Sequence, residues 1–306
     1  YDLGLDGLSI LLTAWVSLLA LVALVSERSA ATDRSATALV LCCESALLGL
    51  FLARDVFLLL AFLGTALTSL TLLLGRVSPS CMRRFFFFQT VGLILLFGLA
   101  AVLSHLSYVQ TGFASGALAR WEGLVLFPEL ETRFFFVGAA AIAFLAPQLL
   151  ALFWLPRALF TLNPSGRILV MGGYSLVGGY LLFRFVLQLV PRGAEAGSFS
   201  LLAFAVIGLV FVAIAPWRSR ERGLSWERLL VAYQSLVFVG LMTFREEAVA
   251  AALVLLLHQA GALTALAVCT AETDATKRAI PAGVIEKTLF ALSCVSLFAI
   301  PSVGRV

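Results

Sequence analysis

Residues 8–26 read LSILLTAWVSLLALVALVS, a stretch of 19 residues without a charged side chain. An α-helix rises about 1.5 Å per residue, so about 20 apolar residues cross the roughly 30 Å hydrocarbon core of a bilayer. Nine further apolar stretches follow, separated by polar connections. Because a helix satisfies its own backbone hydrogen bonds, which lipid cannot do, the sequence predicts an all-α integral membrane protein with about ten transmembrane helices.

The composition favours a single polytopic membrane domain over residues 1–306. Hydrophobic residues make up 61% of the chain and charged residues only 12%, whereas a soluble domain has about 25% charged residues. The connections leave no room for a nucleotide-binding or flavin domain, and a net charge of +4 is too diffuse to indicate nucleic-acid binding. The predicted spans are 8–26, 36–53, 56–75, 85–106, 134–156, 166–190, 198–216, 227–244, 246–268 and 284–303.

The basic residues of the connections predict the orientation in the membrane. If the spans alternate in direction, thirteen Lys and Arg side chains lie on one side and six on the other. The richer side should face the cytoplasm or the mitochondrial matrix, which places the N-terminus on the outer side. The thirteen are Arg28, Arg34, Arg76, Arg83, Arg84, Arg157, Arg167, Arg218, Arg220, Arg222, Arg228, Lys277 and Arg278.

Two prolines predict discontinuous helices. Pro147 lies in the middle of the fifth span and Pro301 lies in the tenth, and proline removes a backbone donor and clashes with the preceding turn. Broken helices of transporters often border an ion path. The five-span separation predicts an internal repeat of five helices, roughly 36–156 and 166–303. The alternative is an ordinary proline kink at each position.

Ionisable groups inside a span are costly and are therefore candidates for function. Glu44 and His258 lie in mid-span, and we expect them to border a proton path, because a carboxyl group can exchange protons and histidine titrates near neutrality. The alternatives are a carboxyl group kept neutral or paired between helices, and a buried histidine bonded to a hydroxyl group.

The remaining candidates are weaker. Arg184 lies toward one end of the sixth span, where it either extends to the membrane surface or forms an ion pair. Glu286 and Lys287 begin the tenth span and form an interfacial pair in this interpretation. The five cysteines show no metal-binding spacing. Glycine pairs at 172–173 and 178–179 predict close helix packing.

Several stretches resemble chain 4 of NADH–ubiquinone oxidoreductase, an antiporter-like membrane-arm subunit of respiratory complex I. The runs FWLPRA at 153–158 and GGYLLFRF at 178–185 are similar to that family's W-L-P-x-A…G-x-Y-G-L-L-R-F pattern. GLDGLS at 4–9 and AYQS at 232–235 follow the family in the same order, and His258 falls where it has a histidine. The resemblance implies that the five-helix repeat is an antiporter-like inverted repeat. It also implies that the ten spans are helices three to twelve of fourteen, and that the chain is divergent and truncated at both ends.

The departures from the family concern its charged residues. The family's carboxylate in its fifth helix falls on Gly64, and its two central lysines fall near Leu145 and on Leu176. A further histidine falls on Phe238. In these subunits the glutamate–lysine pair is thought to drive proton transfer, so the resemblance implies that the Glu/Lys channel residues are largely lost here.

The leading interpretation is a membrane-arm subunit of proton-translocating NADH:ubiquinone oxidoreductase, with no redox centre of its own. Expected partners are other membrane-arm subunits and lipids, including anionic lipid, while NAD, FMN, iron–sulfur clusters and ubiquinone belong to other subunits. The expected location is the mitochondrial inner membrane, with the bacterial plasma membrane as the alternative. Other open interpretations are a purely structural subunit, a stand-alone cation/proton antiporter, and chain 5 or chain 2 of the same enzyme.

Overall fold

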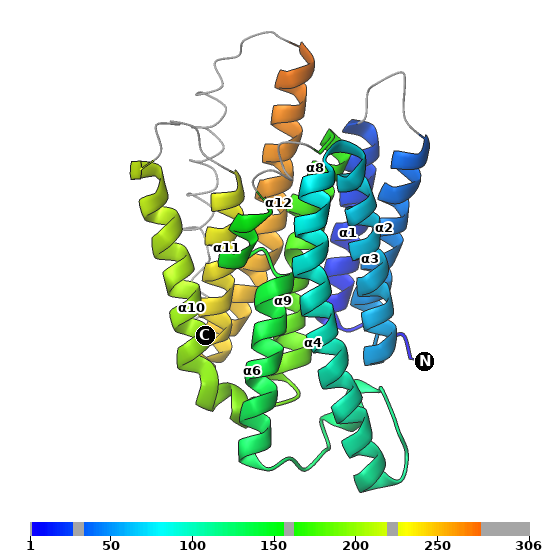
Figure 1. Cartoon of the computed structure of the whole chain (residues 1–306), viewed down its shortest axis with the longest axis vertical. Coiled ribbons are helices and arrows are strands. Elements are labelled where there is room, and N and C mark those ends of the chain that lie inside the picture. Colours follow the sequence, from blue (N-terminus) through cyan, green and yellow to red (C-terminus); the bar gives the residue numbers. More distant parts are fainter. Residues whose placement is uncertain (1, 27–33, 156–161, 219–225, 277–306) are drawn as a thin grey trace, which may run out of the picture.

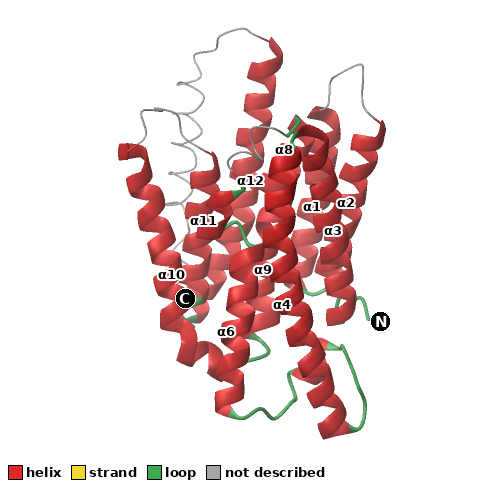
Figure 2. Ribbon diagram, viewed as in Figure 1, coloured by secondary structure: helices red, strands yellow, loops and turns green. Residues whose placement is uncertain are grey.

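A computed structural model of the chain describes residues 2–26, 34–155, 162–218 and 226–276. These residues form a bundle of long helices that run alternately up and down (Figures 1 and 2). The elements are α1 (Gly7–Ser26), α2 (Arg34–Leu52), α3 (Val56–Val77), α4 (Pro79–Thr111), α5 (Leu118–Trp121), α6 (Pro128–Leu145), η1 (Leu149–Phe153), α8 (Pro164–Ile168), η2 (Leu169–Tyr174), α9 (Ser175–Leu181), η3 (Leu182–Leu187), α10 (Pro191–Arg218), α11 (Trp226–Leu241) and α12 (Glu246–Thr276).

The all-helical membrane fold is confirmed. Eight spans among the described residues are long and apolar enough to cross a bilayer. Helix α11, with 16 residues, occupies the position of the predicted span 227–244. The predicted span 284–303 lies outside the described residues.

Helix α4 is longer than predicted at both ends. It runs for 33 residues, from Pro79 to Thr111, rather than over 85–106. Ser78 accepts a hydrogen bond from the Cys81 backbone N–H, and a proline at the first helical position has no donor to satisfy. Gly112, with φ of 78°, ends the helix in the left-handed conformation that glycine tolerates.

The link between α2 and α3 is as short as the sequence predicts. Asp55 caps α3, and its Oδ1 accepts hydrogen bonds from the backbone N–H groups of Phe57 and Leu58 at 2.9 and 3.2 Å. The backbone of Arg54 pairs with Asp2 on one side and Leu118 on the other. The hairpin is thereby tied to both neighbouring segments.

The sixth span, residues 164–187, forms the centre of the bundle, and 89% of its apolar window is buried. It packs against α1, α6, α11 and α12. The sequence predicts one continuous helix here, but the structure has two π-helical segments, η2 and η3, on either side of α9. Such segments carry an extra residue per turn and are frequent at functional sites.

The fifth span is broken at the position of Pro147. Helix α6 ends at Leu145, Ala146 is extended with ψ of 150°, and a 3₁₀ helix resumes at Leu149. Because proline has no backbone N–H, the carbonyl groups that end α6 need other donors. Pro301, the second predicted break, lies outside the described residues.

Candidate functional site

A row of buried, uncharged polar side chains crosses the bundle beside the break in the fifth span. Each member is at most 2% exposed. The members come from α4, the break itself, η2, α9, α11 and α12, so six segments contribute. We call the set the polar row; it consists of Gln89, Gln148, Tyr174, Ser175, Gln234, Ser235 and Gln259.

Tyr174 joins the broken helix to α4. Its hydroxyl group donates to the backbone carbonyl oxygen of Leu145, the last residue of α6. The same hydroxyl lies 2.7 Å from the side-chain oxygen of Gln89. The ring of Tyr174 packs against Phe85 and Trp154, with centroid distances of 6.1 and 6.3 Å. These contacts fix the hydroxyl at the carbonyl group that the break leaves without a helical partner.

The other half of the polar row joins the break to α11 and α12. The Ser235 hydroxyl donates to the Gln148 side-chain oxygen at 3.2 Å. The side-chain amides of Gln234 and Gln259 lie 2.9 Å apart, and Gln259 also donates to the Ser175 carbonyl oxygen at 3.2 Å. Buried polar groups of this kind are stable only when they are hydrogen-bonded.

Glycines make room for the row. A Cβ atom on Gly178 would lie 2.4 Å from the Cβ of Ala146 and 2.9 Å from the Nε2 of Gln234. One on Gly172 would lie 2.2 Å from the Thr264 hydroxyl. The close packing that the glycine pairs predict therefore occurs, and it brings the centre of the bundle against the break.

Four atoms of the polar row have no hydrogen-bond partner within the described protein. They are two amide nitrogens and two oxygens, and each is fully buried. Buried polar groups of this kind usually bind internal water. The atoms are Gln89 Nε2, Gln148 Nε2, Ser175 Oγ and Gln259 Oε1.

The two predicted proton-path residues occupy different environments. His258 adjoins Gln259 on α12, is half-buried, and its ring lies 6.3 Å from the ring of Tyr233 in an edge-on arrangement. Glu44, on α2, is also half-buried, but it makes no hydrogen bond or ion pair with any described residue. His258 thus precedes a member of the polar row in sequence and packs against Tyr233, whereas Glu44 lies on another helix and has no bond to the row.

Arg184 forms an ion pair. Its Nη1 lies 2.7 Å from Oδ2 of Asp6, so η3 is tied to the start of α1. Asp6 also caps α1 by accepting the Ser9 backbone N–H at 2.8 Å. Burial raises the pKa of Asp6, but the hydrogen bonds from Ser9 and the charges of Arg184 and Arg54 outweigh burial and lower the pKa overall.

The remaining predicted residues, Glu286 and Lys287, lie outside the described part of the chain. Within that part, no group of three or more His, Cys, Asp and Glu side chains is placed to hold a metal ion.

Three of the positions that the resemblance matches to charged residues or histidine of the family are apolar and buried here. Leu145, Leu176 and Phe238 are each fully buried in the core. Leu176 follows Ser175 of the polar row, and Leu145 provides the carbonyl group that Tyr174 binds. Neutral groups thus fill the surroundings of the break.

Sequence reasoning missed the polar row, because it considered ionisable side chains only. A signal was present: four of the six glutamines of the chain, Gln89, Gln148, Gln234 and Gln259, lie inside or at the break of apolar spans. An amide group needs several hydrogen bonds. Glutamines at this depth therefore indicate a polar network.

Curated relatives confirm the resemblance in sequence. NADH-quinone oxidoreductase subunit 13 of Thermus thermophilus is 31% identical over 248 residues, which is 78% of this chain and 49% of that protein. Subunit M of Rhodobacter capsulatus is 23% identical, over 79% of this chain and 49% of that protein. NADH-ubiquinone oxidoreductase chain 4 of Metridium senile is 26% identical, over 65% and 40%. The chain spans about half the length of the curated relatives it matches, and no family model matches it.

Solved structures show that the fold is shared more widely. Respiratory complex I from Thermus thermophilus contains a chain that matches 88% of this one with a TM-score of 0.73 and 23% identity, over 57% of its own length. The Mrp complex from Dietzia contains another that matches 87% with a TM-score of 0.73 and 20% identity, over 30% of its own length. At these identities the likeness shows the fold alone.

Proposed function

We propose that this chain, a homologue of subunits M and 13 of NADH-quinone oxidoreductase, is a membrane-arm subunit of a proton-translocating NADH:quinone oxidoreductase. The relatives are named as subunits of that enzyme, and we extend the role to this chain, which spans about half of their length. In this role the chain is part of an enzyme but has no redox centre, and other subunits hold NAD, FMN, the iron–sulfur clusters and the quinone.

The polar row beside the helix break is the observation that carries the mechanistic part of the proposal. Its hydroxyl and amide groups donate and accept hydrogen bonds, but they do not change charge near neutral pH. Together with bound water, such a row can hold a hydrogen-bonded path in the low-dielectric centre of the bundle. It cannot store a proton, so we propose that the subunit supports translocation without a glutamate–lysine switch of its own.

Native electrophoresis tests the subunit assignment. Membranes are solubilised mildly, stained for NADH dehydrogenase activity, and the active band is analysed by mass spectrometry. We expect this chain in the active band at a stoichiometry near one. Its presence only in a small particle without that activity would overturn the proposal.

The number of protons translocated per electron tests whether the ionisable groups inside the spans take part in proton transfer. We expect Glu44→Gln and His258→Gln to lower the ratio in sealed vesicles if these residues border a path. The matched control is Glu122→Gln, which removes an exposed carboxyl group outside the spans. A ratio unchanged in both variants would favour a purely structural subunit.

A stand-alone cation/proton antiporter is the second candidate, favoured by the structural match to the Mrp complex. An independent antiporter needs coupled acidic and basic groups at its centre. In the described spans, the only mid-span ionisable groups of this kind are Glu44 and His258, and no ion pair joins them. Ion exchange by the purified chain in vesicles would establish this alternative.

The proposed compartment depends on the proposed assembly. Relatives occur in bacteria and in Metridium senile, and the chain has the spans of a membrane protein. We propose the mitochondrial inner membrane, with the bacterial plasma membrane as the alternative, and with other membrane-arm subunits as partners.

A further inference from the structure

A groove opens on the outer surface of the bundle where α2, α3 and α4 meet at one end. Its volume is about 660 Å³, within the range of ligand pockets. The groove starts at the first turn of α2 and continues for two turns along it, from Ser35 to Cys42. Its lining residues are Ser35, Ala38, Leu39, Cys42, Leu72, Gly75, Arg76 and Met82.

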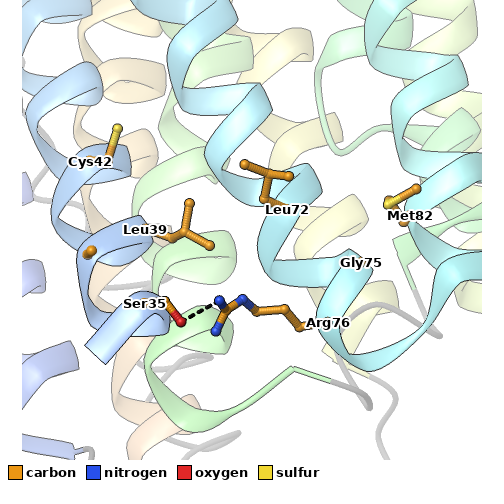
Figure 3. A pocket seen from close by; sticks show the side chains of 8 residues that line it. Ser35, Leu39, Cys42, Leu72, Gly75, Arg76 and Met82 are labelled. Carbon is orange, nitrogen blue, oxygen red and sulfur yellow. Dashed lines mark hydrogen bonds between the residues drawn. The ribbon is translucent and has the colours of Figure 1, made fainter. Parts of the chain in front are cut away.

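The groove is polar at the helix ends and apolar deeper in the membrane. Arg76 reaches across from α3 and donates to the hydroxyl of Ser35 on α2 (Figure 3). Leu39 and Leu72 line the part farther from the ends of the helices (Figure 3). Leu72 is 51% exposed, so this part of the groove faces the surroundings of the bundle.

Four arginines lie at this end of α2, α3 and α4. Arg76 lines the groove, Arg34 precedes Ser35, and Arg83 and Arg84 follow Met82. All four are exposed. They belong to the thirteen basic residues that the charge distribution assigns to one membrane side, and they come from the adjoining ends of three helices.

Gly75 allows α3 and α4 to pack closely at the groove. A Cβ atom on Gly75 would lie 2.6 Å from the Sδ of Met82. Because Gly75 has no side chain, the first turn of α4 approaches the last turn of α3, and Arg76 follows directly at the mouth.

We propose that this groove binds one anionic phospholipid, with the phosphate group at Arg76 and one acyl chain along Leu39, Cys42 and Leu72. The guanidinium group supplies charged donors that match a phosphate group. Basic pockets between transmembrane helices on the inner side of a membrane are typical anionic-lipid sites. The apolar wall excludes a soluble phosphate compound as the preferred ligand, because such a compound would leave that wall without a partner.

Photo-crosslinking in membranes tests the site. The complex is placed in nanodiscs that contain photoactivatable phosphatidylglycerol or, in a parallel sample, phosphatidylcholine with the same diazirine-labelled acyl chain. Adducts are mapped by mass spectrometry of peptides covering 35–42 and 72–82. We expect phosphatidylglycerol adducts in both peptides and few phosphatidylcholine adducts.

Two variants separate the charge of the site from its shape. Arg76→Gln should reduce the phosphatidylglycerol adducts about fivefold, as expected for one arginine near the membrane surface. Ala38→Phe fills the groove without altering charge and should reduce them as well. Both positions are exposed, so the fold tolerates the changes. The matched control, Arg120→Gln, removes an exposed arginine at the opposite end of the bundle and should have no effect.

Three results would overturn the proposal. Equal adducts from the two lipids would show a site without preference for negative charge. An unchanged amount of phosphatidylglycerol adducts in Arg76→Gln would show that Arg76 does not bind the lipid. Crosslinking of a reagent on Cys42, an exposed cysteine of the groove, to another polypeptide in place of lipid would show that a protein covers the groove.

Discussion

The sixth span and the second span both carry polar groups through the bilayer, but they do so in different surroundings. The sixth is 89% buried and the second is 39% buried. Tyr174 in the sixth is neutral, fully buried and hydrogen-bonded to two other segments. Glu44 in the second is half-buried and has no hydrogen bond or ion pair within the described protein.

The difference follows from the cost of desolvation. A neutral hydroxyl or amide group loses little on burial when one or two partners satisfy it, whereas an ionised carboxylate loses far more. The centre of this bundle therefore uses groups that do not ionise, and its mid-span acidic group lies toward the surface. There, water or another subunit can satisfy Glu44.

Crowding the central helix should produce the largest effect. Gly178→Val places a side chain against Ala146 and Gln234, and we expect a loss of about 3 kcal/mol in the free energy of unfolding. Denaturant unfolding of the detergent-solubilised protein measures it. Gly98→Val is the matched control, because nothing lies within 4 Å of a Cβ atom there. Equal losses in the two variants would show that Gly178 does not set the packing of the centre.

Removing one hydroxyl group from the polar row should have a smaller effect. Tyr174→Phe keeps the ring but leaves the Leu145 carbonyl group without its donor, and we expect a loss of about 2 kcal/mol. The same unfolding measurement applies. Tyr108→Phe, at a position that is 55% exposed, is the control. A Tyr174→Phe variant as stable as the control would contradict a structural role for the row.

The ion pair at the membrane face should contribute less again. Asp6→Asn should cost about 1 kcal/mol at pH 7, because the pair is partly exposed. The folded-state pKa of Asp6 is lowered, so its contribution is present at neutral pH and is lost as the pH falls below about 4. The difference between the thermal midpoints of wild type and variant should therefore be full at pH 7 and should shrink as the pH falls below about 4. A difference that does not shrink below that pH would show that the charge of Asp6 does not contribute, and Asp2→Asn is the control.

The smallest effect on stability is expected at Glu44. Without a bonded partner in the described protein, Glu44→Gln should change the free energy of unfolding of the isolated chain by less than about 0.5 kcal/mol. The stability of the same variant is then measured within the assembled complex and compared with that of the isolated chain. A larger loss there would identify a partner for Glu44 on another subunit.

Much of the fold could be predicted because its determinants are local. The length of the apolar stretches predicts the spans, Pro147 predicts the break, and the short Arg54–Asp55 link predicts the hairpin. Each acts within a turn or two of its own position. The π-helical segments could not be predicted in this way, because they depend on how the sixth span packs against its neighbours.

The candidate site could be predicted only in part, because its contacts join distant segments. Three of its hydrogen bonds connect residues 84 to 87 positions apart: Tyr174 to Gln89, Ser235 to Gln148, and Gln259 to the Ser175 carbonyl group. Arg184 pairs with Asp6. Both residues belong to stretches that resemble the family, but the sequence did not predict that they form a pair. A sequence indicates which side chains are costly in lipid, but the fold determines which of them meet.

Helix α4 is long enough to project from the membrane. Its 33 residues correspond to about 50 Å, whereas the hydrocarbon core is about 30 Å thick. Its C-terminal end and the segment up to α6 extend beyond α1 and α3, at the end of the bundle opposite Arg76 and the groove (Figure 1). A protease added to sealed vesicles of one orientation would reach this projection, and the cleavage pattern would report which face of the membrane holds the N-terminus.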